Sequence, residues 1–333
     1  MAVYTAIDDP EAYFQIKLYA GDSTNHALTF DGDTDMQPNA VWNKERDAAI
    51  NHYLYDSVRG VGKRLQQNVN ALESDTDSTW FQSFDSDGFS IGSEDNINDT
   101  GDNYVAWCWK ESATSGFDIV TATGTGSAHT IAHSLSAVPH MIISKEKSGS
   151  VNDWTVYHQG ITSAPETDSL ILNETNAFQD NATHWNDTAP TSSVFTVGTG
   201  SVVNRTDSTY VYYLWTGIQG FSKFGSYIGN GDADGAFVYT GFRPLWVMLK
   251  QTGEARNWLI LDNKRDTGNP NSTDLLANAD DAEQTNVRFD SLSNGFKLRL
   301  GSSASNKVSQ NYIYAAFAEA PFVNSNGVPC NAR

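Results

Sequence analysis

The sequence predicts an all-β protein made of three tandem antiparallel β-sandwich domains. The main observation is an aromatic segment that occurs three times, as YVAWCW at 104–109, YVYYLW at 210–215 and YIYAAF at 312–317. Turn-forming residues are also abundant, with 26 glycines beside many Asn, Asp, Ser and Thr residues. No long heptad run or alanine- and leucine-rich stretch predicts a helical protein.

Three further blocks recur in the same order in each third of the chain. They are a segment from Pro to Lys, then an aromatic or aliphatic alternation, then a turn into Phe. The blocks lie at 38–44, 139–145 and 244–250, at 52–56, 154–158 and 258–262, and at 87–89, 193–195 and 294–296. A repeat of this length is a whole small domain copied in tandem, not a short solenoid repeat.

The blocks also set the domain boundaries. With 333 residues the chain is long enough for three cores. We expect a leader and a polar tail around three units: leader 1–12, unit 1 at 13–112, unit 2 at 113–218, unit 3 at 219–322 and tail 323–333.

Each unit is expected to begin and end with a strand. The opening strands precede glycine turns, at 16–21, 119–124 and 227–229. The closing strand is apolar on both faces, since Val105 and Trp107 point to one face and the residues between them to the other. Such a strand belongs in the middle of a covered sheet, and two sheets packed face to face are the simplest way to cover it.

One stretch favours a different structure. Residues 44–65 are charged, contain two adjacent alanines and could form a helix. The corresponding segments 148–151 and 253–256 are too rich in Gly and Ser to sustain one. We therefore expect strand and loop here, with at most a short helix.

The charge balance excludes several function classes. The chain has 21 basic and 40 acidic residues, a net charge of −19. Such a surface repels nucleic acid and anionic membranes, and no apolar run reaches membrane-spanning length. The two cysteines, Cys108 and Cys330, predict no disulfide framework and synthesis in a reducing compartment. Cys108 is expected to be a small core residue, because Leu214 and Ala316 take its place in the other units.

No cofactor or metal centre is predicted. The alternation of Asp31, Asp33 and Asp35 could supply oxygen ligands to Ca²⁺, but the glycine and closing Glu of a full calcium loop are absent, so a solvated turn is favoured. The histidine and cysteine spacings do not match a zinc motif.

The sequence also predicts no catalytic residues. It contains no nucleophile elbow, phosphate loop or dinucleotide fingerprint, and the expected strands are poor in Glu. Trp80 and Trp185 precede the turn into Phe and are candidates for stacking on a sugar, with packing at a sheet edge as the favoured alternative.

Five segments together resemble a family of structural proteins of tailed phages, marine phages and cyanophages among them. They are YTAIDDPEAYFQ (4–15), TFDGDTDMQP (29–38), LYDSVRG (54–60), SFDSDGF (83–89) and YVAWCWK (104–110). The resemblance is strong over unit 1 and weaker, though collinear, over units 2 and 3. It implies lectin-like sandwich repeats of the concanavalin or jelly-roll kind, on a tail fibre or other tail appendage or as decoration of the capsid surface.

We therefore expect a non-enzymatic virion structural protein, made in the host cytoplasm and located in the virion. Its partners would be other virion proteins, reached through residues 1–12 as an added strand at a sheet edge, and a homo-oligomer is left open. Two alternatives are kept: a host-attachment protein that binds a host-surface glycan through loops at one end of the sandwiches, and a polysaccharide depolymerase.

Overall fold

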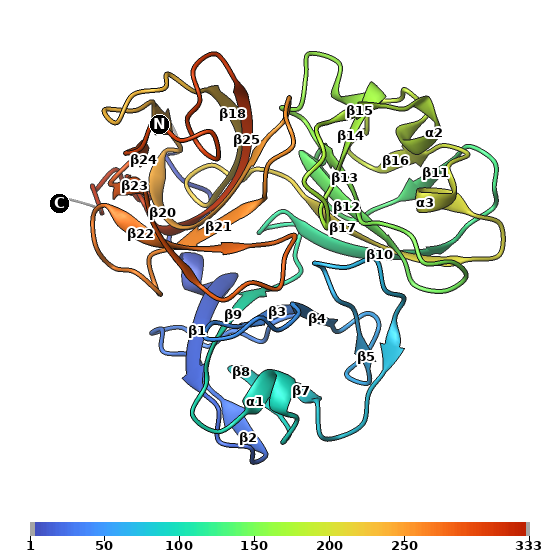
Figure 1. Ribbon diagram of the computed structural model, residues 1–333, viewed down its shortest axis with the longest axis horizontal. Helices are drawn as coiled ribbons and strands as arrows, with labels where there is room; N and C mark the ends of the chain where they lie inside the picture. The colour runs from blue at the N-terminus through green and yellow to red at the C-terminus, as the bar shows by residue number, and fades with distance from the viewer. Residues whose placement is uncertain (1–3, 331–333) are drawn as a thin grey trace.

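The repeated blocks form the same four-strand arrangement in each unit of the computed structural model, which describes residues 4–330. In unit 1 the opening strand β1 (Phe14–Ala20) pairs with the closing strand β9 (Asn103–Trp109). β9 pairs in turn with β3 (Ala40–Glu45), and β3 with β4 (Tyr53–Asp56). Every pairing is antiparallel. Figure 1 shows the three units as three lobes around a common centre.

Units 2 and 3 repeat this order and its register. Their strands are β10 (Phe117–Thr123), β17 (Thr209–Trp215), β12 (Met141–Glu146) and β13 (Thr155–His158), then β18 (Ser222–Ile228), β25 (Asn311–Pro321), β20 (Phe242–Gln251) and β21 (Leu259–Asp262). Trp42 lies opposite Trp107, as Ile143 lies opposite Tyr213 and Met248 opposite Ala315. The repeat inferred from sequence is therefore also a repeat of strand order and register.

The outer strands differ between units. Unit 1 has a separate sheet of β2 (His26–Leu28), β8 (Gly88–Ile91) and β7 (Phe81–Asp85), beside a ribbon of β5 (Lys63–Arg64) and β6 (Ser74–Asp75). Unit 2 pairs β11 (His129–Ala132) with β16 (Val194–Val197) and extends its main sheet by β14 (Asp168–Ile171) and β15 (Gln179–Asp180). In unit 3, β22 (Asn271–Leu276), β23 (Gln284–Leu292), β24 (Gly295–Leu298) and β19 (Phe237–Tyr239) continue the main sheet into one eight-stranded sheet that nearly closes into a barrel.

Helices are few and short in the described part of the chain. They are η1 (Pro10–Ala12), α1 (Asp95–Asn98), η2 (Pro165–Thr167), α2 (Ala182–Trp185) and α3 (Ser201–Asn204). None of them is long and apolar enough to cross a membrane. Residues 44–65 form strand and loop without a helix, as the corresponding segments predicted. The prediction of an all-β chain is confirmed.

Each main sheet separates two cores. On β9, Tyr104, Ala106 and Cys108 face the core inside unit 1. Val105 and Trp107 face a central core to which all three units contribute. The two-faced closing strand and the core position of Cys108 are therefore confirmed. Full burial of one large apolar side chain contributes about 1.5–3 kcal/mol, so the central core is a principal source of stability.

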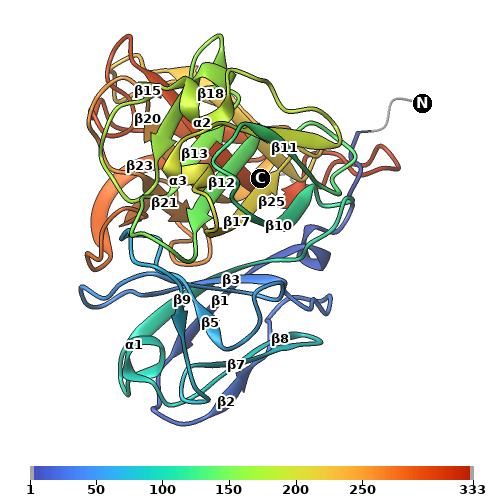
Figure 2. The same ribbon diagram turned by 90° about the vertical axis from the view of Figure 1, so that its right-hand side faces the viewer.

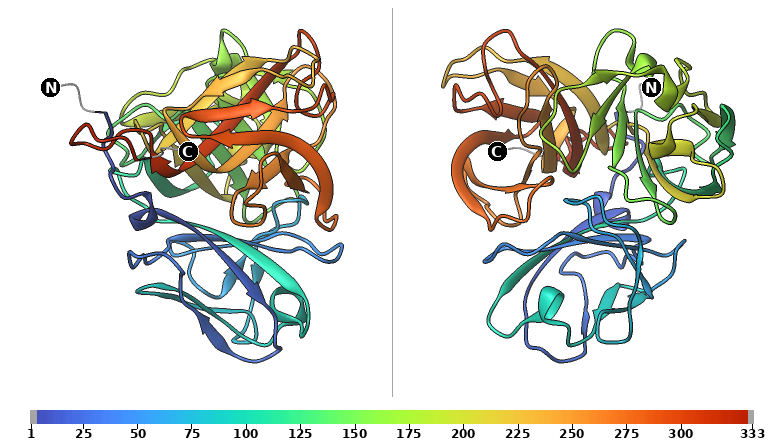
Figure 3. Two further views of the ribbon diagram at one scale, coloured as in Figure 1. Left: turned by 90° about the vertical axis from the view of Figure 1, so that its left-hand side faces the viewer. Right: turned by 45° about the vertical axis from the view of Figure 1, so that its right-hand side comes forward.

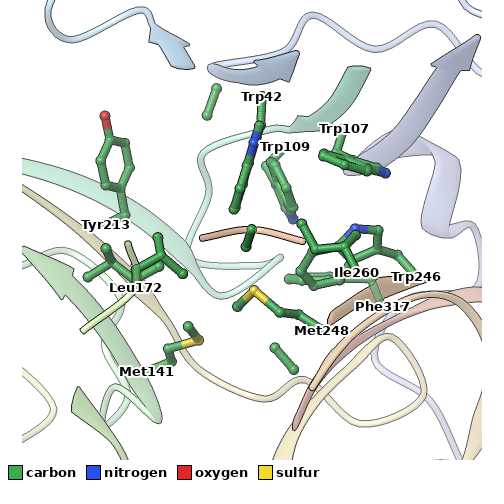
Figure 4. Close-up of a cluster of buried hydrophobic side chains, with 14 of the residues drawn as sticks. Trp42, Trp107, Trp109, Met141, Leu172, Tyr213, Trp246, Met248, Ile260 and Phe317 are labelled. Carbon is green, nitrogen blue, oxygen red and sulfur yellow. The ribbon is translucent and has the colours of Figure 1, made fainter. Parts of the chain in front are cut away.

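The central core is rich in aromatic and sulfur-containing side chains (Figure 4). It brings together Trp42, Trp107, Trp109, Met141, Tyr213, Trp246, Met248 and Phe317, among others. Figure 2 shows unit 1 below the other two units, with its main sheet turned toward them. The three units are thus joined by one shared core, in addition to the core that each encloses for itself.

A tyrosine fixes the start of each closing strand in the same way. The hydroxyl of Tyr104 donates to the carbonyl of Asp95 at 2.9 Å and accepts from the backbone N–H of Asp99 at 2.8 Å. The hydroxyls of Tyr210 and Tyr312 make the same two hydrogen bonds. Each donates to the carbonyl nine residues earlier in the chain and accepts from the backbone N–H five residues earlier. The repeated tyrosine thus ties the preceding loop to the sheet.

Candidate functional site

The polar contacts between units follow one cyclic order. We call each contact between two units a seam: seam 1/2, seam 2/3 and seam 3/1. At seam 1/2, the Tyr213 hydroxyl of unit 2 donates to Asp56 Oδ2 of unit 1 at 2.6 Å. At seam 3/1, Trp107 Nε1 of unit 1 donates to Asp262 Oδ2 of unit 3 at 3.1 Å. Both donors occupy the same position of the closing strand.

Seam 2/3 completes the order with a different pair. The third equivalent of Trp107 is Ala315, which has no side-chain donor. His158 therefore donates from Nε2 to the neighbouring backbone carbonyl of Tyr314 at 3.1 Å. Its Nδ1 accepts from the N–H of Gly160 at 3.0 Å, which places the hydrogen on Nε2. Burial lowers the pKa of His158 to about 4, so the ring is neutral at physiological pH.

A second set of ring nitrogens crosses all three seams in the direction of the Tyr213 and Trp107 bonds, from each unit to the one before it. Trp154 Nε1 of unit 2 donates to the carbonyl of Gln66 in unit 1 at 2.9 Å, and Trp258 Nε1 of unit 3 to the carbonyl of Ile171 in unit 2 at 2.9 Å. In unit 1 the same position holds His52, whose Nε2 lies 3.1 Å from the carbonyl of Ala279 in unit 3. Each unit is thus bonded to the one before it, and unit 1 to unit 3.

The lysines of the Pro-to-Lys blocks are buried and structural. Lys145 Nζ binds the carbonyl of Asn70 across seam 1/2 at 3.0 Å, and Lys250 Nζ binds that of Thr175 across seam 2/3 at 2.9 Å. Lys44 donates within unit 1, to the carbonyl of Ala48 at 3.1 Å. Burial lowers the pKa of Lys44, Lys145 and Lys250 to about 8. The recurrence of a lysine at a strand end was the sequence signal for this role.

Units 1 and 3 each enclose an acid–arginine–acid triad. In unit 3, Arg265 Nε binds Asp262 Oδ2 at 2.6 Å and its Nη1 binds Glu283 Oε2 at 2.8 Å. Glu283 also accepts two hydrogen bonds from Arg46 across seam 3/1, at 3.0 and 2.9 Å. The arginine side chains of both triads are fully buried. Unit 1 repeats the arrangement with Asp56, Arg59 and Glu73.

Unit 2 replaces this triad with uncharged groups. The residues at the same three positions are His158, Ile161 and Phe178. A backbone hydrogen bond shows that Phe178 corresponds to Glu73 and Glu283. The N–H of each of these residues donates to a backbone carbonyl of the next unit, and for Phe178 the distance is 2.8 Å. Replacing one member of a buried ion triad would leave an unpaired buried charge. Replacing all three residues with uncharged ones, as in unit 2, avoids this cost.

Seam 1/2 contains two carboxyl groups in contact. Burial, a hydrogen bond with Asp118 and the charges of Asp118 and Asp56 raise the pKa of Glu111 to about 7. The N–H of Ile119 donates to Glu111 Oε1 at 3.2 Å, which opposes the shift. With a pKa of about 7, the carboxyl of Glu111 is close to half protonated at neutral pH.

Seam 3/1 opens into a cavity of about 280 Å³ that contains one predicted site residue, Asp31. Asp31 lies 2.6 Å from Lys17 Nζ and 3.6 Å from Lys264 Nζ of unit 3. Partial burial would raise the pKa of Asp31, but these two lysines outweigh it and hold the pKa below its usual value. On the same cavity wall, Arg243 pairs with Glu319 at 3.0 Å.

The other calcium candidates do not converge with Asp31. Asp33 and Asp35 are exposed in the same turn, and the N–H of Asp33 donates to Glu11 Oε2 at 2.9 Å. Within residues 4–330, no group of three or more His, Cys, Asp or Glu side chains is placed to hold a metal ion. The turn is organised by lysines and by the leader.

The two tryptophan candidates are covered by other side chains. Trp185 on α2 is only 2% exposed and meets the edge of Tyr157. Trp80 is half-buried, with the Arg64 guanidinium 3.9 Å above its ring and Tyr53 against its edge. Trp185 is thus buried, one face of Trp80 is occupied by Arg64, and the two rings lie in different units.

The leader packs on its own chain. Thr5 and Ile7 are buried, and the N–H of Ala6 donates to the carbonyl of Gln219, the first residue of unit 3, at 3.1 Å. The N–H of Ser325 in the tail donates to Asp8 at 2.6 Å, and Figure 3 shows leader and tail side by side. Residues 1–3 of the expected docking arm lie outside the described residues.

A second cavity, of about 400 Å³, lies at seam 2/3, where the leader, unit 2 and unit 3 meet. Its lining includes Tyr4, His140, Gln159, Lys223 and Tyr239. These residues come from segments far apart in the chain and share no motif, so no sequence pattern indicates that they form one site.

The chain belongs to the family described as Domain of unknown function (DUF7483), whose model matches residues 9–321. The match covers all three units and part of the leader as one continuous domain. No curated protein matches the sequence.

Proposed function

We propose that this chain is a non-enzymatic structural protein of a phage particle, located on a tail appendage or on the capsid surface. The observation that carries the proposal is the ring of seams. The buried acids, lysines and ring nitrogens form hydrogen bonds that hold the three units together in a closed ring. The bonds of Asp56, Asp262 and His158 are examples. Such a rigid, strongly acidic block suits a particle component made in many copies.

The proposal includes the fold of each unit as a β-sandwich of the concanavalin or jelly-roll kind. In unit 1 the main sheet and the β2-β8-β7 sheet enclose a core that contains Tyr55, Phe81 and Phe89. In unit 2 the main sheet and the β11-β16 pair enclose Phe195 and Tyr212. The facing sheets of units 1 and 2 and the resemblance of unit 1 to phage structural proteins support it, whereas unit 3 encloses its core with a single curled sheet.

Assembly through the leader can be tested in particles. Mass spectrometry of purified virions would measure incorporation of the full chain, of a chain lacking residues 1–12, and of Ile7→Ala. The deletion should abolish incorporation, whereas Ile7→Ala only loosens a buried contact and should leave it intact. Thermal unfolding must show that both variants fold. Normal incorporation of a folded deletion variant would refute assembly through this segment.

Host attachment through a surface glycan is the second candidate, and the cavity at seam 2/3 favours it. Depolymerase activity has less support. Glycosidases place two carboxyl groups about 5–10 Å apart across a cleft, and the carboxyl pair of Glu111 and Asp118 lines neither of the two cavities described above. Incubation with host envelope polysaccharide should therefore release no reducing ends.

A further inference from the structure

The cavity at seam 2/3 has two exposed aromatic rings at its rim. Tyr4 of the leader is 52% exposed and Tyr239, at the end of β19, is 55% exposed. Lys223 Nζ lies 5.2 Å from the centroid of the Tyr239 ring and donates to the carbonyl of the same residue at 2.7 Å. The lysine therefore fixes Tyr239 in place, while much of the ring stays open to solvent.

The same cavity contains hydrogen-bonding groups with unused capacity. His140 Nδ1 accepts from the N–H of Gly217 at 2.9 Å, so in the neutral ring the hydrogen is on Nε2. Burial lowers the pKa of His140, which favours this neutral form. Gln159 donates from Nε2 to the carbonyl of Phe224 at 2.6 Å, which orients the amide and leaves Oε1 as an acceptor.

The cavity at seam 3/1 provides an internal comparison. β1 lines one cavity and β18 the other, and these strands are equivalent in the repeat. At seam 3/1 most of the charged side chains form ion pairs, Asp31 with two lysines and Arg243 with Glu319. Its lining contains no tyrosine or tryptophan. The two cavities therefore differ in chemistry: ion pairs line the cavity at seam 3/1, whereas the cavity at seam 2/3 combines exposed tyrosine rings, neutral donors and acceptors and a single charged side chain, Lys223.

We propose that the cavity at seam 2/3 binds a neutral saccharide. The C–H face of a sugar ring packs against an aromatic ring, and its hydroxyls both donate and accept, which suits Tyr4, Tyr239, His140 and Gln159. A volume of about 400 Å³ is in the range of ligand pockets, ~300–1,000 Å³, and admits a short oligosaccharide segment. The net charge of −19 disfavours a polyanionic ligand.

The test uses the full chain and an array of neutral and acidic bacterial surface oligosaccharides, followed by titration calorimetry with the strongest neutral hit. Tyr239→Ala should weaken binding at least tenfold, because it removes the exposed ring. Tyr239→Phe, which keeps the ring, should weaken it by threefold or less. Lys264→Ala, in the cavity at seam 3/1, should leave the affinity unchanged.

Three results would overturn the proposal: no neutral hit above background, binding of acidic glycans alone, or wild-type affinity of Tyr239→Ala. Near-UV circular dichroism checks that each variant is folded. A free monosaccharide of the hit, titrated in parallel, shows whether one sugar ring suffices or an extended chain is needed. Incorporation of Tyr239→Ala into particles should be normal, so failure of glycan binding and failure of the structural role can be told apart.

Discussion

Tyr213 of unit 2 donates a 2.6 Å hydrogen bond to Asp56 of unit 1, and the same carboxylate oxygen accepts from Arg59. The three groups belong to two units and are buried together. The stability of one unit therefore depends on a side chain supplied by the next.

Tyr213→Phe should lower the free energy of unfolding by about 1–3 kcal/mol, because it removes a buried hydrogen bond to a charged group. Urea unfolding followed by tryptophan fluorescence measures the change. Tyr239→Phe is the matched control, since its ring is exposed, and it should change stability by less than about 0.5 kcal/mol. Equal effects of the two substitutions would show that the contact between Tyr213 and Asp56 contributes nothing.

Arg265→Met should cost about 3–5 kcal/mol, because it leaves the fully buried carboxylate of Asp262 without its cation, whereas Glu283 keeps Arg46. The triple variant Asp262→His, Arg265→Ile, Glu283→Phe copies the residues of unit 2 and should be more stable than the single variant. Arg299→Met, which removes an arginine that is 40% exposed, should cost less than about 1 kcal/mol. If the triple variant had a lower free energy of unfolding than Arg265→Met, His158, Ile161 and Phe178 would not be equivalent to the triad of unit 3.

Glu111 should make stability depend on pH. Its pKa is about 7 in the folded chain and ~4.3 in an unfolded one, so the folded state binds more protons in this interval. The contribution of Glu111 to stability is therefore present at pH 4, falls as pH rises to about 7 and is level above that. Glu111→Gln cannot lose a proton and should lack this fall. Urea midpoints of both proteins from pH 4 to 8 test it, and a constant difference between them would exclude the effect.

Unit 2 produced alone, as residues 113–218, should fail to form a folded monomer. Its main sheet would expose Phe117, Ile143 and Tyr213, which the other units cover in the full chain. Light scattering coupled to size-exclusion chromatography should show self-association, with the full chain under the same conditions as control. A monomer that unfolds cooperatively would mean that the central core is not needed for the fold of a unit.

The sequence predicted the repeated strands of the three units but not the central core that joins the units. Alternation along residues 104–109 correctly separated two apolar faces, because side chains of a strand alternate whatever covers them. It could not say that the Trp107 face meets the other units, since both faces are equally apolar. A central core contributed by three units leaves the same local pattern as three separate ones.

The site candidates show the same limit. Asp31 is paired with Lys264, which is more than two hundred positions away, so no local spacing could reveal it. Trp80 and Trp185 looked available because their neighbours are polar, yet Arg64 and Tyr157 cover them. One usable signal was overlooked: an Asp precedes an Arg by three positions in units 1 and 3, and unit 2 lacks both.

The replacement of the buried triad in unit 2 has a consequence for how such a protein can diversify. In an assembly of three identical chains, every substitution appears three times, and a change that opens one contact opens all of them. Here a single polypeptide supplies three similar but separately encoded modules, so His158, Ile161 and Phe178 could alter one boundary while the charged boundaries kept their form. Specialisation of one junction is compatible with a scaffold that stays intact.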